Sequence, residues 1–94
     1  MISFEYMVTI PSLDTVIYMQ DGSGDQLLAE DYEQGYDSYV DYEIRSGKNK
    51  GDGGLYMYKS ADIVSDDWRD AIPEAIKFAL DLDTCPKYTL TEVE

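Results

Sequence analysis

Carboxylates are the groups most able to do chemistry in this sequence. The chain has 20 Asp and Glu residues against 7 Lys and Arg, which gives a formal charge of −13 over 94 residues. Between residues 21 and 43 every charged residue is an acid: Asp21, Asp25, Glu30, Asp31, Glu33, Asp37, Asp41 and Glu43. Like charges at this density repel one another and attract a cationic partner. Direct binding to DNA, RNA or an anionic membrane is disfavoured, because phosphate contacts need clustered Lys and Arg.

Metal binding is another use of carboxylates, and the spacing here argues against it. Asp21, Ser23 and Asp25 have the 1, 3, 5 spacing of an EF-hand loop. Gln26 stands where that loop needs glycine, and Tyr32 stands where it needs a bidentate glutamate. We therefore expect no metal site and no cofactor.

Catalytic groups are scarce. The chain has no histidine, which removes the usual general base at neutral pH. Cys85 is the single cysteine, so it forms no internal disulfide, and we interpret it as a structural residue of a cytoplasmic protein. A chain this short rarely encloses a substrate cleft. The sequence favours a protein that is not an enzyme, while a small hydrolase with a carboxylate pair remains a third alternative.

The elements that position the acids follow from the pattern of apolar residues. Alternation and β-branched runs predict strands over residues 2–10, 15–19, 37–45, 55–59 and 87–93. In the first strand Phe4, Tyr6 and Val8 are expected to point inward with Ile2 and Ile10. The glycine-rich stretch up to Gly54 is interpreted as a flexible hairpin tip.

Two helices are predicted. Residues 25–34 favour a short helix, with Ser23 and Gln26 as a capping box and Gly35 as its end, although a strand here stays open. A longer helix is expected from the N-cap Ser65 to about residue 83, with Pro73 either kinking it or beginning its second half. Its buried stripe is Trp68, Ile72, Ala75, Ile76, Ala79 and Leu80.

These elements predict one α+β domain over residues 1–94, in the order β-β-α-β-β-α-β. Strands joined by hairpins give a mostly antiparallel sheet, with one or two helices packed on one face. The other face must meet water or a partner. No stretch approaches the roughly 18 apolar residues of a membrane span, and the alternating start does not fit a signal peptide.

The strand that begins at residue 37 places acids on this uncovered face. With Val40, Tyr42 and Ile44 inward, the alternate outward residues lie about 6.7 Å apart, comparable to neighbouring phosphates of a nucleic-acid strand. Tyrosines at positions 32, 36 and 39 are interleaved with the acids, and tyrosine is frequent in interface hot spots. The candidate partner-binding residues are Glu30, Asp31, Glu33, Tyr36, Asp37, Tyr39, Asp41 and Glu43.

In size, single-domain α+β character, the acidic run of residues 21–43 and the absence of catalytic groups, the chain resembles small acidic inhibitors from phages and mobile elements. These are proteins of the anti-CRISPR and DNA-mimic type. The resemblance implies a non-catalytic inhibitor that blocks the basic nucleic-acid-binding surface of a bacterial defence nuclease, such as a CRISPR effector, in the host cytoplasm.

A second function class stays open. The chain fits a structural or regulatory interaction module, for example a homodimer formed through a sheet edge or a binder of a basic toxin. Acids on an exposed face can also serve solubility alone. Both a monomer and a homodimer are compatible with these sequence features.

Overall fold

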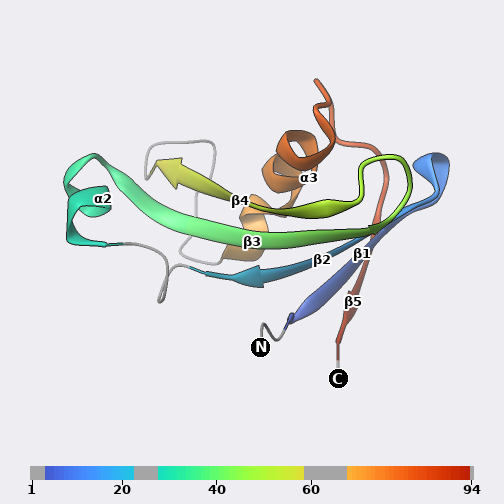
Figure 1. Ribbon diagram of the computed structural model, residues 1–94, viewed down its shortest axis with the longest axis horizontal. Helices are drawn as coiled ribbons and strands as arrows, with labels where there is room; N and C mark the ends of the chain where they lie inside the picture. The colour runs from blue at the N-terminus through green and yellow to red at the C-terminus, as the bar shows by residue number, and fades with distance from the viewer. Residues whose placement is uncertain (1–3, 23–27, 59–67, 94) are drawn as a thin grey trace.

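The computed structural model describes residues 4–22, 28–58 and 68–93. It confirms the α+β class: a five-stranded antiparallel sheet carries helix α3 on one face (Figure 1). The order of strands and α-helices is the predicted one, with two short 3₁₀ helices added. The elements are β1 (Tyr6–Ile10), η1 (Pro11–Leu13), β2 (Thr15–Asp21), α2 (Ala29–Glu33), β3 (Tyr36–Ser46), β4 (Gly51–Tyr58), η2 (Trp68–Ala71), α3 (Ile72–Leu80) and β5 (Thr89–Glu92).

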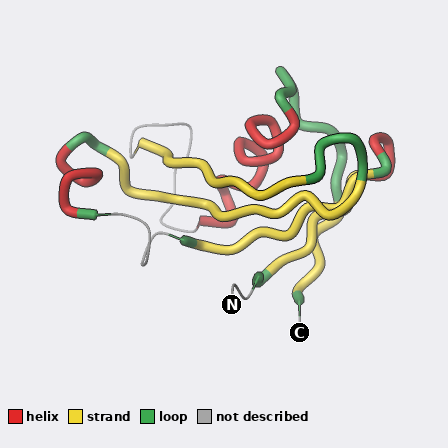
Figure 2. The backbone as a smooth tube through the Cα atoms, viewed as in Figure 1, coloured by secondary structure: helices red, strands yellow, loops and turns green. Residues whose placement is uncertain are grey.

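The sheet has the spatial order β4-β3-β2-β1-β5, and each neighbouring pair is antiparallel. The first four strands therefore form a meander, and β5 returns beside β1 (Figure 2). β3 is the longest strand, and β2 and β4 flank it on either side. This central position makes β3 the element that decides which side chains share a face.

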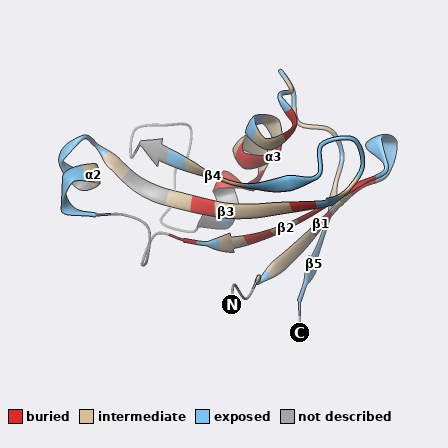
Figure 3. Ribbon diagram, in the orientation of Figure 1, coloured by how far each residue is buried: buried red, intermediate tan, exposed pale blue. Residues whose placement is uncertain are grey.

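The core lies between the sheet and α3, and we call this side of the sheet the covered face. Val8, Ile17 and Ile44 come from three neighbouring strands and are buried against Ile72 and Ile76 of α3. Figure 3 shows these buried segments along the strands and on the inner side of α3. The predicted alternation of β3, with residues 40, 42 and 44 inward, is confirmed.

Helix α3 is shorter than predicted. It begins at Ile72 with Pro73 in its first turn, where a proline is tolerated because its missing N–H would have no partner in the helix. It ends at Leu80 because Asp81 adopts the left-handed conformation (φ 55°). The predicted N-cap Ser65 lies outside the described residues. No helix of the described ranges is long and apolar enough to cross a lipid bilayer.

Helix α2 (Ala29–Glu33) shows that the described part of residues 25–34 is helical and not a strand. Gly35, with φ of 98°, ends it as predicted. The capping box of Ser23 and Gln26 lies outside the described residues, and the carboxylate of Asp31 instead accepts a hydrogen bond from the Leu28 N–H. α2 lies beyond the end of the sheet rather than on the face that α3 covers (Figure 1).

The prediction of a loop up to Gly54 is wrong, because β4 begins at Gly51. Gly53 and Gly54 are strand residues that tyrosines of β3 approach closely. The Tyr42 ring occupies the space where a Cβ of Gly53 would lie, and the Tyr39 ring does the same at Gly54. Glycine here makes room for aromatic rings rather than forming a turn.

Candidate partner-binding face

The side of the sheet opposite α3 is called the open face. Cross-strand register places Glu43 of β3 between Tyr18 of β2 and Asp52 of β4. Two residues earlier on β3, Asp41 lies between Gln20 of β2 and Gly54 of β4 on the same face. Three carboxylates therefore come together from two strands.

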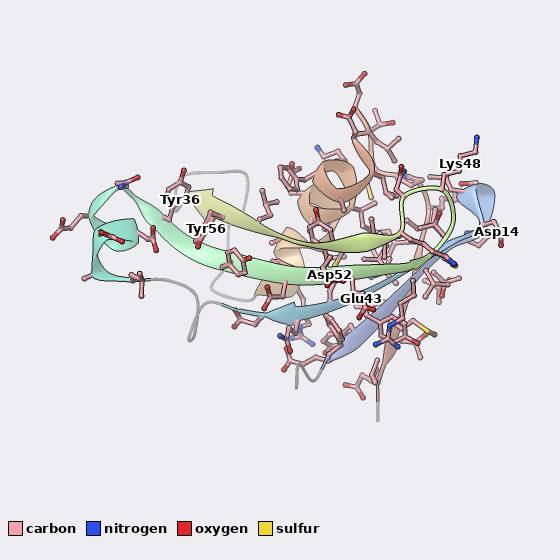
Figure 4. All side chains as sticks on the ribbon, in the orientation of Figure 1. Asp14, Tyr36, Glu43, Lys48, Asp52 and Tyr56 are labelled. Carbon is pink, nitrogen blue, oxygen red and sulfur yellow. The ribbon has the colours of Figure 1, made fainter. Side chains whose placement is uncertain are left out.

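Glu43 and Asp52 are directly opposed like charges (Figure 4). Opposed side chains on neighbouring strands have Cβ atoms only about 4.5–5.5 Å apart, and like charges there are destabilising. Asp41 accepts a hydrogen bond from the side chain of Gln20 at 3.2 Å. The three acids border a shallow hollow of about 280 Å³, whose lining is Phe4, Asp41, Tyr42, Glu43, Arg45, Asp52 and Gly53.

Arg45 lies at the edge of this hollow. Its guanidinium carbon is 3.8 Å from the centre of the Tyr18 ring and 5.7 Å from that of Phe4. Its Nε lies 3.3 Å from a carboxylate oxygen of Glu43. The prediction that Phe4 points into the core is wrong. The strand starts only at Tyr6, so the alternation does not extend to Phe4, whose ring packs near Tyr18 instead.

Tyr36, Tyr39 and Tyr56 form a second group on the open face, which we call the tyrosine cluster. The ring centre of Tyr56 lies 4.5 Å from that of Tyr39 and 5.5 Å from that of Tyr36. In strict alternation Tyr36 and Tyr39 would point to opposite faces. The register shifts between Tyr36 and Ser38, and this irregularity brings both rings to Tyr56.

The Tyr39 side chain lies down along the sheet. Its ring approaches the Cα positions of both Gly22 and Gly54, which flank β3. Any larger residue at Gly54 would need the space that the Tyr39 hydroxyl and ring occupy. The two glycines therefore keep this part of the open face flat and aromatic.

The environment of Tyr39 changes its acidity. Burial is the largest cause that raises the pKa of its phenol above the ordinary value of 10.0, and the negative charge of Asp41 and a hydrogen bond with it add to the shift. Burial also raises the phenol pKa of Tyr42 on the covered face. It does the same for Tyr88, which packs against the core.

These shifts predict that the protein loses stability in alkali. Because the phenols hold their protons more tightly in the folded chain, the unfolded chain deprotonates first, and the free energy of unfolding falls as the pH rises above about 10. Urea unfolding between pH 9 and 11.5 measures this slope. Tyr39→Phe should make the slope shallower, whereas an unchanged slope would show that Tyr39 does not contribute.

The structure brings four of the eight predicted site residues together on the open face: Tyr36, Tyr39, Asp41 and Glu43. Glu30, Asp31 and Glu33 lie apart from them on α2, beyond the end of the sheet. There the Asp31 carboxylate accepts a hydrogen bond from the Leu28 N–H at the start of its own helix. The side chain of Asp37 lies outside the described part of the structure.

Sequence reasoning missed Tyr56, Asp52 and the stack of Arg45 on Tyr18. Tyr56 and Asp52 lie on β4, and only the cross-strand register assigns them to Tyr39 and Glu43. Pairing residues 51–58 with β3 around the turn at residues 47–50 would have placed Tyr56 and Asp52 beside Tyr39 and Glu43. This pairing was not predicted because the glycines up to Gly54 were interpreted as a loop.

Other chemistry has little support in the described residues. Within these ranges, no group of three or more Asp, Glu or Cys side chains is arranged to hold a metal ion. Burial raises the pKa of the Cys85 thiol, although Lys77 opposes this shift. A raised pKa leaves less of the nucleophilic thiolate at neutral pH.

No protein-family model, curated protein or solved structure matches this chain. The function of the protein must therefore be inferred from the chemistry of the open face. The acids and tyrosines there, rather than an inherited motif, are the residues to explain.

Proposed function

We propose that the protein is a non-catalytic inhibitor that binds, through its open face, the basic nucleic-acid-binding surface of a partner protein. The observation that carries this proposal is the gathering of Asp41, Glu43 and Asp52 beside the tyrosine cluster. A nuclease of bacterial defence, such as a CRISPR effector, is the partner class that the resemblance to DNA-mimic inhibitors suggests.

The positions of the carboxylates suit a surface that binds phosphates. Asp41 and Glu43 are two positions apart on an extended strand, or about 6.7 Å, and Asp52 lies opposite Glu43 on the neighbouring strand, about 4.8 Å away. The net charge of −13 adds a long-range field of the same sign. Such a field speeds encounter with a basic surface and suppresses encounter with an acidic one.

The tyrosines supply what charge alone does not. Exposed ion pairs contribute little to affinity because water and salt screen them. Tyrosine buries a large area at a small cost in conformational entropy, and it is enriched where interfaces are tightest. In this proposal, charge steers the partner and the tyrosine cluster makes the packed contact.

Capture from a bacterial lysate at about 0.1 M and at 1 M salt tests this proposal, with the bound proteins identified by mass spectrometry. The Debye length is about 10 Å at the lower salt and about 3 Å at the higher, so capture of a basic partner should weaken strongly. A nucleic-acid-binding protein retained at low salt and released by excess nucleic acid is the expected result. Capture that is indifferent to nucleic acid would contradict the proposal and favour a different kind of interaction module.

A further inference from the structure

Arg45 shows how this face binds a guanidinium group. Its guanidinium lies over the Tyr18 ring and is also close to the Phe4 ring. A carboxylate oxygen of Glu43 lies 3.3 Å from its Nε. The arrangement combines an aromatic ring for the flat side of the group with a carboxylate for its N–H donors. Arginine suits both contacts because its guanidinium is planar, delocalised and weakly hydrated.

The same combination recurs further along β3. Tyr56 of β4 lies directly opposite Tyr39 of β3 and is 41% exposed. Asp41 follows Tyr39 by two residues on the same face, close enough to its phenol to raise that group's pKa. Gly54 lies opposite Asp41, so no side chain of β4 separates the acid from the tyrosine rings.

We infer that Tyr56 and Asp41 form a binding site for an arginine side chain of the basic partner, with Tyr39 as the floor of the site. This inference rests on the proposed function and specifies which cation the open face selects. The guanidinium would stack on the exposed Tyr56 ring and pair with the Asp41 carboxylate. Charge complementarity and the example of Arg45 on the same face commit the site to arginine rather than to an apolar anchor.

Lysine is the informative competitor. An ammonium has the same charge, but it is compact and strongly hydrated and has no flat side to stack. Carboxylates alone also favour arginine somewhat, because its N–H groups can pair with both oxygens, so the informative quantity is the part of the preference that depends on the Tyr56 ring. A surface that offers rings beside carboxylates prefers arginine.

Hexa-arginine and hexa-lysine peptides serve as probes, with binding measured by fluorescence anisotropy at about 0.15 M salt. From the usual strength of exposed cation–π contacts, native protein should bind hexa-arginine about two- to fivefold more tightly. Tyr56→Leu should weaken the binding of hexa-arginine much more than that of hexa-lysine and so lose most of this preference. Tyr56→Phe, which retains the ring, is the matched control and should keep the preference.

The outcomes separate this inference from the proposed function. An equal preference for arginine in native protein and in Tyr56→Leu, or none in either, would overturn the arginine site. The proposed function would survive that result if replacing Asp41, Glu43 and Asp52 together by their amides weakened the binding of both peptides. If the amide variant bound both peptides as native protein does, the proposed role of the open face would fail as well.

Discussion

Replacing Asp41, Glu43 and Asp52 together by Asn, Gln and Asn should slow association with the basic partner by about tenfold or more. These carboxylates lie together on the open face, where they act on the partner as one field. The substitutions are close to isosteric, so the face keeps its shape. Stopped-flow or biosensor kinetics at several salt concentrations would measure the change, which should shrink as salt rises.

The free energy of unfolding of the same variant should lie within about 1 kcal/mol of that of the native protein. The variant removes the repulsion between the opposed Glu43 and Asp52, and it gives up an exposed ion pair between Glu43 and Arg45. These effects are small and opposite in sign. Loss of binding without loss of stability is what separates acids used for recognition from acids needed for the fold.

A matched control changes the net charge by the same amount elsewhere. Asp14→Asn, Asp81→Asn and Asp83→Asn together remove three charges from the turns at residues 14 and 81–83. Asp14 and Asp81 have positive φ angles, which asparagine also tolerates. The control should associate faster than the open-face variant. Equal rates for the two variants would show that only net charge matters and that the open face is not the binding surface.

Replacing Gly54 by Val should destabilise the protein by about 1–3 kcal/mol, the usual cost of overpacking. At an ordinary strand position this substitution is favourable, because valine has a higher strand propensity than glycine. The sign reverses here because the Tyr39 ring and hydroxyl occupy the space of the new side chain. Urea unfolding monitored by circular dichroism measures the difference.

A double variant tests the cause. In the background of Tyr39→Ala, Gly54→Val should be neutral or stabilising, because the ring that opposes it is gone. The difference between the two backgrounds is the coupling energy of the pair. If Gly54→Val costs the same in both backgrounds, Tyr39 does not lie over Gly54 and the tyrosine cluster is arranged differently.

Much of the fold could be predicted because β1 and β3 follow simple alternation and β2 is a run of β-branched and aromatic residues. Alternation along β3 places Val40 and Ile44 on one face of the sheet. The amphipathic helix that contains Ile76 was the element able to bury that apolar face. The pattern failed at the ends of elements. Nothing in the residue types distinguishes Asp81 as a left-handed helix end from a residue that continues the helix.

The candidate site was only half predictable, for a different reason. Asp41 and Glu43 share a face with Tyr39 through local alternation, which a sequence displays directly. Tyr36 joins them only through an irregularity in strand pairing, and Tyr56 only through the register of β4. Those features depend on contacts between strands, such as Tyr39 over Gly54, that strand alternation does not encode.

Displacement of nucleic acid from the purified partner tests the central claim most directly. The partner is first loaded with a fluorescently labelled oligonucleotide, and native protein or the variant of Asp41, Glu43 and Asp52 is then titrated in. We predict that native protein releases the oligonucleotide near equimolar amounts and that the variant needs a much higher concentration. A stable complex that holds partner, oligonucleotide and native protein together would contradict the proposal that the open face occupies the nucleic-acid-binding surface.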